Sequence, residues 1–231
     1  MQISHDDNYS GHVEPRGAPA RRIIHHDAAT VAVTKLSVGP MDNNCYVLAE
    51  VDSGTGIIID AANDAERILD AIGDIDITTI LTTHRHQDHW QALAAVARAT
   101  DARVLHHREE QAHVPVPADG TVAHGDRISL GAASIEILHT PGHTGGSVCA
   151  VLDGTAEDRP DITTHAFTGD TLFPGGPGKT SGEATFEQIM TSLRTQLFTL
   201  DDDTWVYPGH GDDTTIGAER DHLDEWQARG W

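Results

Sequence analysis

The chain carries the stretch ITTILTTHRHQDH at residues 77–89. Its first part, Ile77–Thr83, is rich in β-branched side chains and predicts a short buried strand. In an extended chain, residues two apart point to the same side, so the two histidines that follow can bind one ion together. The four side chains in this stretch that are able to bind a metal fall within six positions: His84, His86, Asp88 and His89.

After this stretch the chain turns into an alanine-rich helix that the spacing predicts over residues 91–99. The turn can direct Asp88 and His89 toward a second point near the first. Imidazole nitrogen suits zinc or iron, and a carboxylate adds a hard anionic oxygen. A turn that served only to cap the helix would need one residue such as Asp88, not three histidines as well. The stretch therefore predicts a metal site.

Three further candidate ligands lie where an apolar strand gives way to a glycine-containing turn. They are His143 in TPGHTGGS, Asp170 in TGDTLF and His210 in YPGHG. Glycine lets the backbone bend tightly and leaves room for ions and substrate. Each residue alone is a weak signal, because histidine and aspartate are common in turns. Together with the first stretch they indicate one shared site.

Apolar patterning divides the chain into two successive halves, each with strands followed by helices. Strands are predicted over residues 31–38, 45–51, 56–60, 77–83, 103–106, 134–139, 147–152, 163–168 and 204–207, and helices over 64–72, 91–99, 186–198 and 218–229. This order predicts an α/β sandwich with helices outside two sheets. We expect one domain over residues 29–231. Residues 1–28 are polar and aperiodic, which predicts a mobile arm or a loosely docked segment.

The composition narrows the classes of function. The 231 residues include 15 Lys+Arg and 36 Asp+Glu, a formal net charge of −21, which disfavours nucleic acid and anionic membranes as partners. No apolar run approaches the ~18 residues of a membrane span, and residues 1–30 lack the layout of a secretory signal. Cys45 and Cys149 each lie in an apolar, strand-like run, which indicates small core residues in a reducing cytoplasm.

The motifs HxHxDH, PGHT, GDTLF and PGH, in this order and spacing, resemble those of the metallo-β-lactamase superfamily over roughly residues 30–222. The resemblance implies a four-layer αββα sandwich with a two-metal site at one end of the sheets. It implies two divalent ions, zinc in first place and iron or manganese as alternatives. The implied ligands are His84, His86 and His143 for the first ion, Asp88, His89 and His210 for the second, and Asp170 between them.

Such a site has a defined chemistry. Two cations about 3.5–4 Å apart can share a hydroxide that is acidified toward neutral pH. This hydroxide would attack a carbonyl that the metals polarise. Asp88 can orient the hydroxide and help to move its proton. We therefore expect Asp88 and Asp170 to be catalytic, without a serine or cysteine nucleophile.

The bridging role that the resemblance implies for Asp170 limits the choice of branches within the superfamily. True β-lactamases of this fold lack an aspartate in that role, whereas thioesterases, lactonases, phosphodiesterases and persulfide dioxygenases have one. The segment TLFPGGPGKT at residues 171–180 resembles the glycine-rich loop of glyoxalase II, which ends in a basic residue that contacts the glutathione part of the thioester. The resemblance implies that Lys179 binds an anionic group of a small thioester substrate. A solvated loop charge is the alternative role for Lys179.

The chain departs from glyoxalase II at three places. Ser181 and Asp212 replace two tyrosines, and the chain ends at Trp231 without the helical domain of the longer enzymes. The chain is therefore most similar to short bacterial glyoxalase II-like (hydroxyacylglutathione hydrolase-like) metallohydrolases, with the thiol carrier left open. Trp90, which follows the metal-binding stretch, fits equally a pocket wall and a core anchor.

Four alternatives remain beside a thioesterase. A persulfide dioxygenase would use one iron, held by His84, His143 and Asp170. A lactonase would need a tyrosine near the site, and the charge of −21 counts against a nucleic-acid phosphodiesterase. A binding protein that had lost its activity would also have lost ligands, yet all seven are present. The sequence leaves the oligomeric state open.

Overall fold

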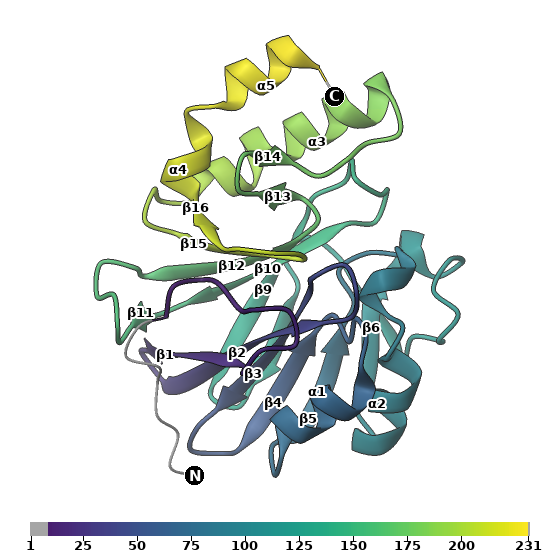
Figure 1. Ribbon diagram of the computed structural model, residues 1–231, viewed down its shortest axis with the longest axis vertical. Helices are drawn as coiled ribbons and strands as arrows, with labels where there is room; N and C mark the ends of the chain where they lie inside the picture. Colours follow the sequence, from purple (N-terminus) through teal and green to yellow (C-terminus); the bar gives the residue numbers. More distant parts are fainter. Residues whose placement is uncertain (1–8, 231) are drawn as a thin grey trace.

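Two β-sheets pack face to face, with helices on the outer face of each, in the computed structural model, which describes residues 9–230 (Figure 1). The first sheet has the strand order β11-β1-β2-β3-β4-β5-β6-β7, antiparallel up to β4 and parallel from β4 to β7. Its strands are β1 (Ala20–His26), β2 (Ala29–Val38), β3 (Asn43–Glu50), β4 (Thr55–Ile59), β5 (Asp76–Leu81), β6 (Arg103–His107), β7 (Gly120–Val122) and β11 (Thr155–Ala156).

The second sheet has the order β16-β15-β12-β10-β9-β8, in which only β12 and β15 run parallel. Its strands are β8 (Arg127–Leu130), β9 (Ala133–His139), β10 (Val148–Asp153), β12 (Thr164–Gly169), β15 (Trp205–Pro208) and β16 (Thr214–Thr215), and β13 (Leu172–Phe173) pairs separately with β14 (Gly176–Pro177). The helices are α1 (Ala65–Ile72) and α2 (Leu93–Thr100) on the first sheet, and α3 (Glu183–Thr195), α4 (Ile216–Arg220) and α5 (Leu223–Arg229) on the second (Figure 1).

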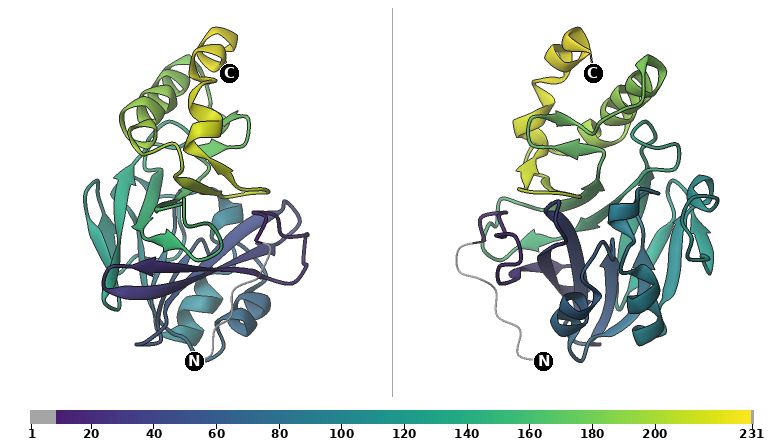
Figure 2. Two further views of the ribbon diagram at one scale, coloured as in Figure 1. Left: turned by 90° about the vertical axis from the view of Figure 1, so that its left-hand side faces the viewer. Right: turned by 45° about the vertical axis from the view of Figure 1, so that its right-hand side comes forward.

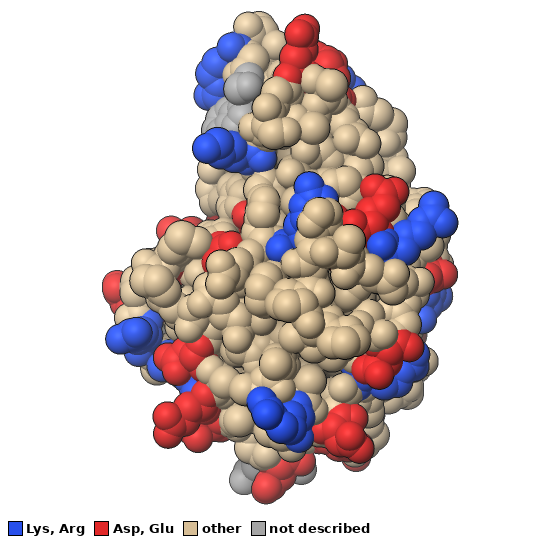
Figure 3. Space-filling view, turned by 90° about the vertical axis from the view of Figure 1, so that its right-hand side faces the viewer, with Lys and Arg blue, Asp and Glu red and all other residues tan. Residues whose placement is uncertain are grey.

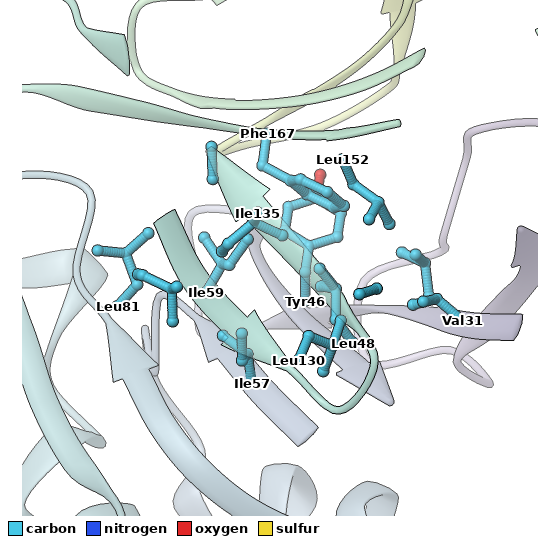
Figure 4. Packing of buried hydrophobic residues seen from close by; sticks show 14 of the residues in the cluster. Val31, Tyr46, Leu48, Ile57, Ile59, Leu81, Leu130, Ile135, Leu152 and Phe167 are labelled. Atoms are coloured by element: carbon cyan, nitrogen blue, oxygen red, sulfur yellow. The ribbon is translucent and has the colours of Figure 1, made fainter. Parts of the chain in front are cut away.

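Three apolar clusters lie between the four layers: one between the two sheets, and one between each sheet and its helices. Successive side chains of a strand point to opposite faces of its sheet, so a strand that is buried on both faces contributes to two clusters. In β3, Tyr46 and Leu48 point between the sheets, whereas Cys45 and Val47 pack toward α1 and α2. Figure 4 shows Phe167 and other side chains of the second sheet facing Tyr46 and its neighbours. The third cluster lies between the second sheet and α3–α5. The expected αββα sandwich is thus the observed fold.

The structure differs from the sequence-based expectation at the N-terminal arm. Residues 1–8 lie outside the described part, but Ala20–His26 forms strand β1, paired with β2 and β11. The buried Arg22 hid this strand from pattern analysis. Its guanidinium pairs with Asp158 at 3.0 Å and stacks 4.1 Å from the centre of the Trp205 ring. A residue that is usually exposed is therefore part of the interior, which apolar alternation cannot reveal.

Smaller differences concern the boundaries of elements. The helix expected over residues 218–229 is two short helices, α4 and α5, so that Ile216 and Trp226 can both pack into the third cluster. The helix expected over residues 186–198 ends at Thr195 and is followed by a 3₁₀ turn over Leu197–Thr199. Strands β7 and β8 were not expected; they have only three and four residues. The two-residue strands β11, β13, β14 and β16 were not expected either, and α3 begins three residues before its predicted start. The other predicted elements lie within two residues of their predicted bounds.

Two expectations drawn from the composition have structural counterparts. Cys45 and Cys149 are both buried and unbridged, and burial raises the pKa of the Cys149 thiol to about 11. Within residues 9–230, no helix has the length and apolar character needed to cross a membrane. Figure 3 shows a face of the molecule on which acidic and basic side chains are interspersed around a broad uncharged area, without a continuous basic patch on that face.

Candidate metal centre

All seven candidate ligands meet at one edge of the sandwich, because each follows the end of a strand that stops there. His84 and His86 follow β5, and Asp88 and His89 lie in a 3₁₀ turn over Gln87–His89. His143 lies in the loop between β9 and β10. The parallel strands β12 and β15 end side by side, so Asp170 and His210, which directly follow them, are brought together.

The ligand atoms form two groups, and within each group they lie no more than 4.8 Å apart. The first group consists of His84, His86, His143 and Asp170, and the second of Asp88, His89 and His210. We call them the first and second ligand groups. The six residues other than Asp170 are grouped as the family resemblance implied, whereas Asp170, expected between the two ions, falls in the first group by these distances.

The Asp170 carboxylate contacts both ligand groups. Its Oδ2 atom lies 3.4 Å from His143 Nε2 in the first group and 3.6 Å from His210 Nε2 in the second. Its Oδ1 atom lies 3.2 Å from His89 Nε2. This carboxylate therefore lies between imidazole nitrogens of both groups.

The imidazole nitrogens in each group are crowded. His86 Nδ1 lies 3.1 Å from His84 Nε2 and 2.8 Å from His143 Nε2. In the second group, 3.2 Å separate the Nε2 atoms of His89 and His210. Nitrogens at these distances must share a proton or surround a cation, because two facing lone pairs repel each other.

The outer ring nitrogens decide which way the lone pairs point. His143 Nδ1 donates to the Lys179 carbonyl at 2.7 Å, and His210 Nδ1 donates to the Met41 carbonyl at 2.9 Å. Because a carbonyl only accepts, these Nδ1 atoms carry a proton, and the Nε2 atoms face the centre, where each can bind a cation or a second proton. This is the arrangement of histidines that bind metals.

His84 and His89 are oriented by one buried carboxylate, Asp60, which the sequence analysis did not single out. His89 Nδ1 donates to Asp60 Oδ2 at 2.8 Å. Thr83 Oγ1 donates to the same oxygen at 2.8 Å and therefore accepts from His84 Nδ1 at 3.0 Å. Asp60 directly follows the buried strand β4, with a φ of 56°. Its position at the end of an apolar strand was the signal available in the sequence.

The two groups differ in protonation. Burial lowers the pKa of His84 well below its usual range, with the facing His89 as the next cause, and burial likewise lowers the pKa values of His86 and His143. Burial alone would also lower the pKa of His89, but the carboxylates Asp170 and Asp60 raise it well above the usual range.

The carboxylates of the site are strongly anionic. Burial would raise the pKa of Asp170, yet the His89 charge and the hydrogen bond from His210 lower it well below its usual range. Burial would lower the pKa of His210, but hydrogen bonds to Asp170 and Asp88 raise it to about 10. In addition, the buried Asp170 Oδ1 lacks a hydrogen-bond partner of suitable geometry. The donor set thus fits divalent cations, which would replace protons at the second group.

A cavity of about 350 Å³ adjoins the first ligand group. It is lined by His86, His143, Lys179, Thr180 and Ser181. The Lys179 side chain is exposed, whereas its carbonyl holds His143. The loop packs directly on the centre, because a Cβ atom added at Gly178 would lie 1.8 Å from the Asp170 carbonyl oxygen.

Trp90 serves as a core anchor rather than as part of this cavity. Its indole Nε1 donates to the Arg85 carbonyl at 2.8 Å, and its ring packs on the cluster under α1 and α2. It therefore holds the HxH segment against the helix layer.

Comparisons with known proteins place this site in a family. The model of the metallo-beta-lactamase superfamily matches residues 38–210. The hydroxyacylglutathione hydrolase GloC of Haemophilus influenzae is 32% identical over 206 residues, covering 80% of this chain and 93% of that protein. Among solved structures, the B3 metallo-beta-lactamase BLEG-1 is 28% identical with a TM-score of 0.71, covering 83% of this chain and 97% of that one.

ETHE1 from Myxococcus xanthus is 30% identical with a TM-score of 0.69, covering 83% of this chain and 82% of that one. Members of the superfamily bind one or two divalent metal ions, and most are hydrolytic enzymes. The match of the family model over most of the chain agrees with the sheets, the strand-end ligands and the motif order described above. The chain belongs to the metallo-beta-lactamase superfamily.

Proposed function

We propose that this protein is a two-metal hydrolase that cleaves a small thioester of the glyoxalase II type. The observation that carries the proposal is the Asp170 carboxylate, which lies within 3.6 Å of imidazole nitrogens from both ligand groups. The similarity to a hydroxyacylglutathione hydrolase supports a thioester as the substrate class. Zinc is the metal that we expect, since imidazole and carboxylate ligands suit it.

When bound, two divalent ions would supply an activated water and polarise the thioester carbonyl. The chain supplies the means of moving the proton. Asp88 Oδ2 accepts from Asn43 Nδ2 at 3.0 Å and lies 3.3 Å from His210 Nε2, so its orientation is fixed. Burial would raise the pKa of Asp88, but hydrogen bonds from His210 and Asn43 and the charge on His89 lower it below its usual range. We assign Asp88 the role of accepting a proton from the water and delivering it to the leaving thiolate.

Lys179 binds the thiol-carrier half of the thioester substrate. Its side chain is exposed at the cavity of about 350 Å³ beside His86 and His143. An ammonium group on a flexible stem suits a carboxylate or phosphate of a thiol carrier. The reacting carbonyl would then lie toward the metal centre and the anionic end toward Lys179.

The test begins with the metal content of the full chain, purified without chelators or metal-affinity columns. We expect two ions per chain and hydrolysis of acyl-thiols that a chelator abolishes and added zinc restores. A panel should include acyl-glutathione, other acyl-thiols and a lactone. One iron per chain, with oxygen uptake on a thiol persulfide, would overturn the proposal in favour of a persulfide dioxygenase. Turnover of the lactone alone would indicate a lactonase.

A pair of matched variants tests the role of Asp88. Asp88→Asn keeps the size and removes the proton acceptor, so hydrolysis should fall by about 10²–10⁴-fold. Asp119→Asn is the control, because Asp119 accepts from the Val104 backbone N–H within the parallel strands and does not contact the ligands. Equal activity of the two variants would refute the role of Asp88.

A further inference from the structure

Lys35 is one of only two lysines in the chain, and its side chain is fully buried in the middle of β2. Its ammonium group donates to the Gly11 carbonyl, the Gly211 carbonyl and Asp213 Oδ1, each at 2.7 Å. These three bonds use all three donors of the ammonium group. Because a buried cation without partners is very costly, Lys35 strongly favours the one arrangement that provides these acceptors.

Two of the acceptors, Gly211 and Asp213, follow His210, a ligand of the second group, in the chain. Gly211 directly follows His210, and its carbonyl also accepts from Asn44 Nδ2 at 3.0 Å. The Pro208 carbonyl accepts from Asn44 Nδ2 at 2.9 Å and from Tyr46 Oη at 2.7 Å. Side chains of β2 and β3 thus hold the backbone of residues 208–211 on both sides of His210.

The N-terminal segment Tyr9–Val13 completes this arrangement. The Gly11 carbonyl accepts from Lys35 and also from the Asp213 N–H at 3.1 Å. Tyr9 Oη donates to Asp213 Oδ2 at 2.8 Å. Gly11 has a φ of 81°, and a Cβ atom there would lie 2.8 Å from Asp213 Cβ. In Figure 2 the N-terminal segment lies beside the β15–β16 hairpin in both views.

The first ligand group has a separate support. The loop that presents His143 is held by the buried Glu110, which accepts from Thr144 Oγ1 at 3.0 Å and from the Gly146 N–H at 2.5 Å. The side-chain hydrogen bonds of Lys35 and Tyr9 within the described part of the chain go to Gly11, Gly211 and Asp213, not to this loop. A substitution of Lys35 should therefore displace His210 of the second ligand group and leave the first ligand group unchanged.

We propose that Lys35, together with the N-terminal segment Tyr9–Val13, is a positioning device for the second ligand group. It fixes the turn from which His210 reaches the centre, and so it sets the affinity for the second ion. The inference rests on the two-metal site of the proposed function. It assigns a role to residues that touch neither the ions nor the substrate.

The test compares stepwise binding of cobalt(II) or zinc to the metal-free full chain, followed by competition with a chelator. Lys35→Met keeps the side-chain length and removes the charge. We expect the first ion to bind as in the wild type and the second ion to bind about 10–100-fold more weakly, the usual effect of losing an outer support of a metal ligand. Gly11→Ala retains Lys35 but displaces the segment Tyr9–Val13 from Asp213, so it should lower the affinity for the second ion as well. If Lys35→Met fails to fold, Gly11→Ala provides the test in its place.

Glu50→Gln is the matched control for general destabilisation. Glu50 is buried at the end of β3, and its carboxylate accepts from the backbone N–H groups of Asp52 and Ser53 rather than contacting Lys35 or residues 208–211. Both ions should bind to this variant with wild-type affinities even where its thermal midpoint falls.

The outcomes separate this inference from the proposed function. If the wild type binds two ions and Lys35→Met binds both with unchanged affinity, or loses both equally, the positioning role is wrong and the two-metal function stands. If the wild type itself binds a single ion, both are overturned.

Discussion

The two ligand groups use the same side chains in opposite electrostatic settings. The first group contains three histidines with lowered pKa values, held by a loop carbonyl and by a threonine. The second contains histidines with raised pKa values that face Asp88 and Asp170. The lowered pKa values favour neutral imidazoles in the first group, and the raised pKa values favour protonated imidazoles in the second. The difference shows that a metal ion at the second group must displace protons, whereas an ion at the first group meets imidazoles whose lowered pKa values favour the neutral form.

Of the substitutions considered, removal of the Asp170 carboxylate should cause the largest loss of metal binding and hydrolysis, because both ligand groups lose a contact. Asp170→Ala takes away a carboxylate that contacts histidines of both groups. Metal content should fall below two ions per chain, and hydrolysis should fall by about 10³-fold or more, since bound ions contribute several kcal/mol to catalysis. Metal analysis and initial rates check this expectation. Unchanged turnover would remove Asp170 from the centre.

Asp60→Asn should lower the metal affinity of both ligand groups to a similar degree. Asp60 orients His89 directly and His84 through Thr83, so it supports one ligand in each group. An amide can donate where a carboxylate only accepts, which disturbs both histidines. We expect each ion to bind about 10–100-fold more weakly, as measured by chelator competition. A loss confined to one ion would show that the groups do not share this support.

The pH dependence of unfolding should differ in sign between the groups in the metal-free protein. His210 has a folded-state pKa of about 10, above its unfolded value, so its contribution is present below pH 6.5 and is lost as the pH rises toward 10. His143 has a lowered folded-state pKa, so its contribution is present above pH 6.5 and is lost as the pH falls.

Two variants separate these contributions. His210→Gln should remove part of the alkaline loss in the free energy of unfolding, and His143→Gln part of the acid loss, as measured by denaturant titration from pH 5 to pH 10. Parallel pH profiles for the two variants would contradict the electrostatic contrast between the groups.

Lys179→Ala should have the smallest effect on hydrolysis. The side chain is exposed, and its carbonyl, which orients His143, is retained in the variant. We expect KM to rise by roughly 2–5-fold, the scale of an exposed charge pair, with kcat and metal content unchanged. A fall in metal content would show instead that the loop, not the substrate contact, had been altered.

Pattern analysis predicted most strands because buried strands in this fold are continuous apolar runs with polar ends. It singled out the seven candidate ligands because each follows such a run, and the structure brings all seven together. It missed β1, since Arg22 is buried through an ion pair and ring stacking that involve residues 158 and 205. It also missed Asp60 and Lys35, whose roles are defined by partners far away in the chain.

The sequence by itself determined the order of strands and helices, the residue types at the metal centre and the superfamily, because these depend on local patterning and on motif spacing. Only the tertiary structure decided which histidines have lowered and which have raised pKa values, which carboxylate orients His84 and His89, and how the N-terminal segment contacts the residues that follow His210. Protonation and orientation depend on atoms within about 4 Å, where electrostatic and hydrogen-bond energies are large. Those neighbours come together only when the two sheets close.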